Sequence, residues 1–194
     1  MITLTVLCAS ALGQDTAKDW CKMGLDLANQ GKFNESIAAA NEAIKLDPTF
    51  ANPWNVKGFA LAALGKYNES IKALNTAIQL DPNFSLPWLN RANSLIEVGR
   101  YDEAIVSANK AIELGVKGGY AWRYKGNALL KLGKYDESIE AYNKAIELFP
   151  DEATQWFNKG KALQALNRTT EANEAFAKAM NWGTRADPSF KQCM

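Results

Sequence analysis

The sequence predicts an all-α solenoid of stacked helix pairs, and a strict internal period is the main reason. Five tryptophans recur at intervals of 34 residues, and a glycine and an aromatic residue return at the same interval in four copies. Self-similarity at a fixed period of this length is typical of stacked repeat arrays. The tryptophans are Trp20, Trp54, Trp88, Trp122 and Trp156, and the glycines are Gly31, Gly65, Gly99 and Gly133.

Each repeat is expected to hold two helices joined by a short corner. In the second copy the first helix starts near Pro53, where the missing proline N–H costs nothing. Gly65 then supplies the left-handed backbone conformation that closes this helix. The second helix is expected to begin at an N-cap, Asn68, and to end at Leu80, because the residue before Pro82 disfavours helical geometry.

The apolar residues explain why the pairs must stack. At 100° per residue, Trp54, Gly58 and Leu61 share one face of the first helix, and the glycine admits a close approach by the second helix. One helix pair cannot enclose both of its apolar faces, so the neighbouring pairs must cover them. The tryptophans are expected to be buried, with about 1.5–3 kcal/mol of stabilisation from each buried large side chain.

These residues resemble the tetratricopeptide repeat, a helix–turn–helix unit of the same length. The resemblance rests on the Trp/Gly/Leu triplet, the Gly-Lys-Tyr corner, a recurring alanine of the second helix and the prolines that follow it. It implies a right-handed superhelical solenoid of antiparallel helix pairs. The Trp-x-x-Lys-Gly pattern also looks like that of repeat proteins from methanogenic archaea. The five units are residues 17–50, 51–84, 85–118, 119–152 and 153–186, which together span 17–186.

One departure from the family pattern recurs. A cation stands where the family often has leucine, and its aliphatic stem can cover apolar surface while its charge reaches water. The four cations are Lys57, Arg91, Lys125 and Lys159.

The fifth copy is degenerate, with Asn167 in place of the corner glycine. The tail at 187–194 is too short to form the solvating cap that such arrays need. Self-association through the uncapped C-terminal end is therefore one alternative function. An accessory repeat domain of a larger protein is another.

Composition favours a binding protein over an enzyme. The chain of 194 residues has a net charge of +1 and no histidine. The near-zero net charge argues against a nucleic-acid partner. The absence of histidine removes the common general base and most zinc ligand sets. We expect no catalytic residue, no cofactor and no metal site.

Residues 1–13 form either a signal peptide or an apolar lead-in to the first helix. Ile2–Gly13 is too short to span a bilayer, which takes about 20 residues, and Ala9-Ser10-Ala11 offers a small-residue cleavage site. The positively charged segment with which a signal peptide normally starts is absent. If residues 1–13 are a signal peptide, the protein is expected to be secreted or on the cell surface. The alternative is a cytoplasmic location. Export would open four sequons to glycosylation, at Asn34, Asn68, Asn83 and Asn167. The simpler explanation is structural, because Asn34 and Asn68 stand at expected starts of second helices, where asparagine serves as an N-cap.

The resemblance also implies a concave groove, lined by the first helix of each pair, that binds a peptide or protein segment. The helical wheel independently selects residues opposite the tryptophan and glycine. Asparagines there can bond a peptide backbone, and the apolar groups can hold side chains. The selected residues are Asn55, Phe59, Leu89, Asn93, Tyr120, Arg123, Asn127, Phe157, Asn158 and Lys161, with Cys21 in the first copy.

Arg123, Asn127 and Asn158 also match three of the five elements of a clamp that some family members use to bind a C-terminal carboxylate. The remaining two elements fall at Pro188 and Gln192 and do not match, so consensus asparagines beside one arginine are the simpler reading. Cations exceed anions along the groove, which predicts an acidic-hydrophobic ligand bound across repeats three to five.

Export can be tested in the native host. If residues 1–13 include a signal peptide, the mature protein should begin near Leu12 or Gln14. Mass spectrometry of the purified protein gives this directly, and an intact Met1 on cytoplasmic protein would contradict the signal-peptide hypothesis.

Overall fold

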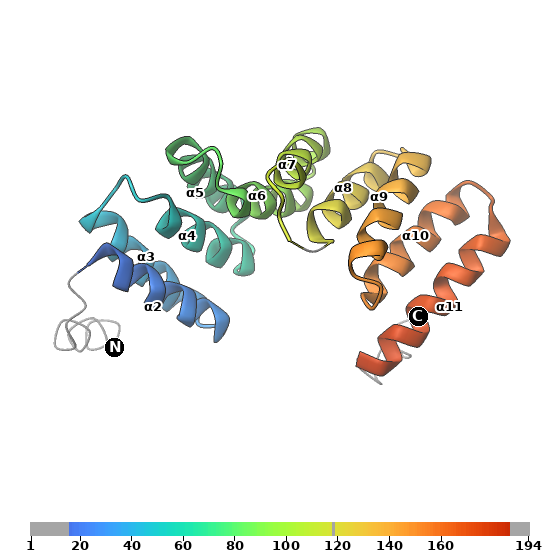
Figure 1. Cartoon of the computed structure of the whole chain (residues 1–194), viewed down its shortest axis with the longest axis horizontal. Coiled ribbons are helices and arrows are strands. Elements are labelled where there is room, and N and C mark those ends of the chain that lie inside the picture. Colours follow the sequence, from blue (N-terminus) through green and yellow to red (C-terminus); the bar gives the residue numbers. More distant parts are fainter. Residues whose placement is uncertain (1–15, 118, 187–194) are drawn as a thin grey trace. The chain divides into compact units, whose positions relative to one another are not determined.

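The computed structural model describes residues 16–117 and 119–186, and within these ranges every regular element is an α-helix (Figure 1). The chain divides into two compact units, one ending at Val98 and the other beginning at Gly99. The expectations for residues 1–13 and for the tail at 187–194 lie outside the described residues. None of the helices in the described ranges is both long and apolar enough to span a bilayer.

The N-terminal unit consists of five helices that pack in chain order. Each helix contacts the next, and α4 also contacts α2 and α6, so the first helices of successive pairs form one layer. The helices are α2 (Ala17–Asn29), α3 (Phe33–Leu46), α4 (Ala51–Ala63), α5 (Tyr67–Leu80) and α6 (Ser85–Glu97).

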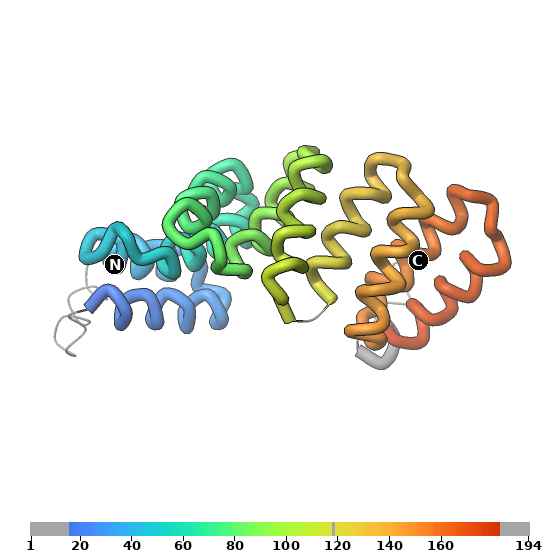
Figure 2. The backbone as a smooth tube through the Cα atoms, turned by 45° about the horizontal axis from the view of Figure 1, so that its top comes forward, coloured from blue at the N-terminus to red at the C-terminus, as the bar shows by residue number. Residues whose placement is uncertain are grey.

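The C-terminal unit continues the pattern, and Figure 2 shows its helices following one another along the chain. Here α8 contacts both α9 and α10, which again places the first helices side by side. Its helices are α7 (Tyr101–Glu113), α8 (Tyr120–Lys131), α9 (Tyr135–Leu148), α10 (Ala153–Ala165) and α11 (Thr169–Ala186). The boundary between the units falls inside the third repeat, between its two helices, which the even period of the sequence does not indicate.

The corners have the predicted backbone conformation but a different cap. Gly65 has φ +74°, and Asn167 has φ +57° at the equivalent corner of the fifth copy. The N-cap prediction for Asn68 is wrong, because α5 begins at Tyr67 and its N-cap is Lys66, without a side-chain bond. The Lys66 amide donates to the Leu61 carbonyl, and the Lys66 carbonyl accepts from Ser70 N, both at 2.9 Å. Backbone hydrogen bonds therefore close this corner, without a side-chain bond from the N-cap residue.

The close approach predicted at Gly58 is confirmed. A Cβ atom added there would lie 2.5 Å from Cγ of Leu74 on α5. In later copies the same position is Gly126, where a Cβ would lie 2.8 Å from Cε1 of the Tyr142 ring, and Gly160, where it would meet a phenylalanine ring. The glycine thus allows a large side chain of the second helix to lie against the first helix's backbone.

The expectation that all five tryptophans are buried is wrong for four of them. Trp20 is 7% exposed and belongs to the apolar core of the first pair, whereas the other four are half-buried. Their indoles lie at the edge of each pair, where the recurring cation stacks over the ring at 4.5–5.6 Å. Three indoles also donate to a proline carbonyl six residues earlier, at 2.9–3.2 Å: Trp54 to Pro48, Trp88 to Pro82 and Trp156 to Pro150.

The glycine contact can be tested by a double-mutant cycle. Gly58→Ala should destabilise the protein by about 1–3 kcal/mol, because the new methyl group overlaps Leu74. Leu74→Ala alone should cost about 2–5 kcal/mol through the cavity that it leaves. In the double variant the methyl group added at position 58 enters that cavity, so its loss of stability in urea should be smaller than the sum of the two. Additive losses would contradict the proposed contact.

Candidate functional site

The best-defined candidate surface lies on α8 and α10 of the C-terminal unit. We call it the A face and define it by Tyr120, Arg123, Tyr124, Asn127, Phe157, Asn158 and Lys161. On a helical wheel, Tyr120, Arg123 and Asn127 project from one side of α8, roughly opposite Trp122 and Lys125. Because α8 and α10 are in contact, these side chains belong to one surface.

Arg123 is held by aromatic rings and one carboxylate. Its guanidinium lies 5.1 Å from the Tyr120 ring centroid and 5.3 Å from that of Tyr124. One terminal nitrogen lies 3.7 Å from a carboxylate oxygen of Glu152, just before α10. The Nε atom is buried and has no hydrogen-bond partner in the described structure. Arg123 is therefore fixed in position, with its charge partly balanced and one donor unused.

The Asn127 side chain is oriented by two donors to the same oxygen. Its Oδ1 accepts from the Tyr142 hydroxyl at 2.7 Å and from Asn158 Nδ2 at 3.2 Å. Tyr142 is fully buried on α9, and burial raises the pKa of its hydroxyl, which therefore stays protonated as a donor. Among the described residues, the amide hydrogens of Asn127 and the carbonyl oxygen of Asn158 have no partner, so these groups can bind a ligand.

Aromatic side chains pack at the two ends of the A face. The Phe157 ring packs 5.6 Å from Phe176 of α11, and the Lys161 ammonium lies 5.4 Å from the Phe157 ring centroid. Tyr120, which is 39% exposed, packs 5.8 Å from Phe149. A cation and an aromatic ring thus lie together at both ends of the surface.

In the N-terminal unit, the selected residues are uncharged, and two of them are asparagines. Phe59 is 41% exposed and contacts the edge of Phe33 at 6.5 Å. Asn55 is 9% exposed, and its Oδ1 accepts from Asn90 Nδ2 at 3.0 Å, so its carbonyl oxygen links α4 to α6. The other two selected residues, Leu89 and Asn93, are half-buried on α6.

Cys21 does not line a binding surface, contrary to the expectation from the helical wheel. It is 7% exposed and packs in the core with Trp20, Ala40 and Val56. Desolvation raises the pKa of its thiol to about 11. The wheel angle alone could not show that Val56 of α4 covers this side of α2.

Sequence reasoning also missed several supporting residues. Tyr142 and Glu152 fix the A face from outside the selected helix positions, and Tyr124 and Asn90 lie one place beyond the positions that the wheel selected. A wider arc on the wheel would have found the last two. Among the described residues, no three His, Cys, Asp or Glu side chains come close enough together to bind a metal ion.

Family comparisons identify the repeats. A family model described as TPR repeat matches residues 58–98 and 126–167. Models described as tetratricopeptide repeat match residues 17–50, and residues 87–114 and 154–182. Together they cover most of the chain. A search of curated proteins found no match.

Solved structures share the fold at low sequence identity. MamA 41-end from Desulfovibrio magneticus RS-1 is 22% identical with a TM-score of 0.78, over 89% of this chain and 98% of that one. YrrB, described as a TPR protein with an unusual peptide-binding site, is 18% identical with a TM-score of 0.72, over 91% of each chain. The APC/C hetero-tetramer Cut9–Hcn1 is 19% identical with a TM-score of 0.78, over 94% of this chain and 36% of that one.

The burial of Cys21 predicts a slow reaction with thiol reagents. With its pKa near 11 the thiol is almost wholly protonated at neutral pH, and only the thiolate is nucleophilic. Iodoacetamide should therefore modify Cys21 much more slowly in the native protein than in guanidinium chloride, as followed by peptide mass spectrometry. Equal rates in the two conditions would show that the side chain is accessible.

Proposed function

We propose that this chain, which belongs to the tetratricopeptide repeat family, is a non-catalytic scaffold that binds a segment of a partner protein on its A face. The proposal rests mainly on one observation. Cations and aromatic rings lie together there, with Arg123 over Tyr120 and Lys161 over Phe157. Such pairs bring apolar contact area and positive charge to the same place.

The charges of the A face favour a ligand that carries acidic groups. Glu152 partly balances Arg123, whereas Lys161 is exposed and has no carboxylate partner among the described residues. Lys131, at the end of α8, is also exposed. Positive charge of this kind attracts anionic segments and speeds their association, and the effect weakens as salt increases.

The polar and apolar groups between the cations favour an extended peptide. Asn127 offers amide hydrogens and Asn158 offers a carbonyl oxygen, which match the acceptor and donor of a peptide backbone. Phe157 and Tyr120 provide rings for apolar side chains. We therefore infer an acidic-hydrophobic peptide segment as the ligand.

The similar structures support the general class of function. YrrB is described as having a peptide-binding site and Cut9–Hcn1 as part of a hetero-tetramer. At 18–19% identity they show a shared fold, so the ligand chemistry proposed here depends on this chain's own residues.

A designed peptide tests the proposal. A fluorescent Asp-Leu-Glu-Phe-Asp peptide should bind, and its charge-inverted Lys-Leu-Arg-Phe-Lys counterpart should bind the A face more weakly. Lys161→Glu should reduce the affinity for the acidic peptide about three- to tenfold, mainly through slower association. Phe157→Leu should mainly speed dissociation, because it removes the ring while keeping an apolar side chain.

The matched control is Lys134→Glu, which makes the same charge change in the loop between α8 and α9. In stopped-flow fluorescence at two salt concentrations, this variant should associate with the acidic peptide at the same rate as the unmodified protein. If Lys161→Glu and Lys134→Glu had the same effect, the acidic-ligand proposal would fail. Circular dichroism should confirm that each variant keeps its helical content.

A further inference from the structure

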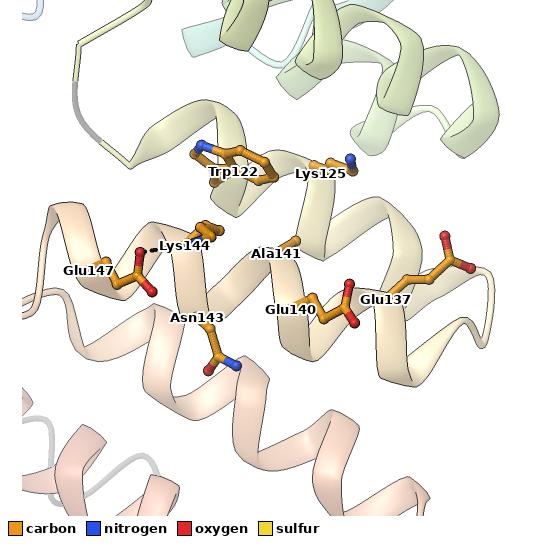
Figure 3. A pocket seen from close by; sticks show the side chains of 8 residues that line it. All are labelled: Trp122, Lys125, Glu137, Glu140, Ala141, Asn143, Lys144 and Glu147. Carbon is orange, nitrogen blue, oxygen red and sulfur yellow. Dashed lines mark hydrogen bonds and ion pairs between the residues drawn. The ribbon is translucent and has the colours of Figure 1, made fainter.

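A pair of related pockets lies outside the A face, one in each of the last two repeats. The first is formed by α8 and α9 and has a volume of about 520 Å³, whereas the second, formed by α10 and α11, has only about 80 Å³. Trp122, Lys125, Glu137, Glu140 and Lys144 line the larger pocket (Figure 3). The residues 34 positions later are of the same types and line the smaller one.

The two pockets differ in the position of one lysine. In the smaller pocket the Lys178 ammonium lies 4.4 Å from the Trp156 ring centroid, beside Lys159 at 5.4 Å. In the larger pocket the equivalent Lys144 turns to Glu147, with its nitrogen 2.9 Å from the carboxylate oxygen. The residue equivalent to Glu147 is Asn181, which cannot form an ion pair.

In the part of the chain that the structure describes, only Lys125 stacks over the Trp122 indole, with its ammonium 5.3 Å from the ring centroid. Over Trp156 a second cation is present, and burial together with the nearby Lys178 charge lowers the pKa of Lys159. The smaller pocket thus shows that a lysine ammonium fits over the tryptophan ring in addition to the cation that recurs in each repeat.

Two carboxylates add charge complementarity at the larger pocket. Glu137 and Glu140 are exposed on α9, and no ion pair involves either of them in the described part of the chain. Figure 3 shows both on the helix that faces Trp122 and Lys125. The lining of the larger pocket thus combines an indole ring with two carboxylates that have no ion-pair partner in the described part of the chain.

We propose that the pocket between α8 and α9 binds an arginine or lysine side chain from a basic segment of a partner protein. The cation occupies the position over Trp122 that Lys178 occupies over Trp156. On α8, Trp122 and Lys125 project roughly opposite Tyr120 and Asn127. The C-terminal unit therefore has two binding surfaces with opposite charge preferences.

Tryptophan indole N–H signals in NMR spectra test this inference on the full chain. Titration with acetyl-Arg-Gly-Arg-amide should shift the Trp122 signal saturably, with the signal assigned by its loss in Trp122→Phe. The Trp156 signal should stay in place, because Lys178 already covers that ring. Acetyl-Glu-Gly-Glu-amide should leave the Trp122 signal unchanged.

Two reciprocal variants exchange the positions that the lysine takes in the two pockets, over the tryptophan ring or beside a glutamate. Glu147→Asn removes the partner of Lys144, which should then lie over Trp122 and weaken binding about two- to fivefold, the value of one exposed cation–π contact. Asn181→Glu gives Lys178 an acidic partner and should make the Trp156 signal respond to the basic peptide. Glu137→Gln with Glu140→Gln should also weaken binding.

Glu113→Asn is the matched control, since it removes the equivalent pair with Lys110 on α7. Binding at Trp122 should not change in this variant. No shift at Trp122, an equal shift with the acidic peptide, or unchanged binding in Glu147→Asn would overturn the inference. These outcomes are independent of the A face, which is tested separately with the acidic peptide.

Discussion

The contact between a small residue of one helix and a large side chain of the next is the constraint on which this fold depends. At Gly58 there is no space for even one additional carbon atom, because Leu74 fills it. Gly126 meets the ring of Tyr142 in the same way. Protein interiors are packed densely enough that such contacts fix the separation and orientation of two helices. In these pairs that separation also limits which side chains of the two helices can face solvent.

Tyr142 connects this packing to the candidate site. Its ring lies against Gly126, and its hydroxyl donates to Asn127 on the same helix as that glycine. One buried side chain therefore sets the distance between α8 and α9 and orients an amide on the A face. A binding surface fixed by core packing loses little side-chain entropy when a ligand arrives, which favours affinity.

The stacked helix pairs could be predicted from the sequence because the tryptophan and most of the corner residues recur with the period. The positions of the A face residues on α8 and α10, apart from Tyr124, also followed from helical geometry. The half-exposed tryptophans could not be predicted, because a wheel shows direction and not how far a neighbouring helix covers a side chain. Residues such as Glu152 and Tyr142 were missed for a related reason. They reach the surface from other elements, and no spacing within α8 or α10 encodes them.

The lysine that differs between the two pockets connects the proposed binding site with an ion pair that contributes little to stability. The Lys144–Glu147 pair is exposed and spans one helical turn, and such pairs stabilise a helix by only about 0.2–0.5 kcal/mol. In the next repeat the position equivalent to Glu147 is Asn181, and the pocket there is much smaller. A mutation at this position should therefore change the free energy of unfolding very little. A repeat array built in this way can diversify its ligands copy by copy while its core sequence stays the same.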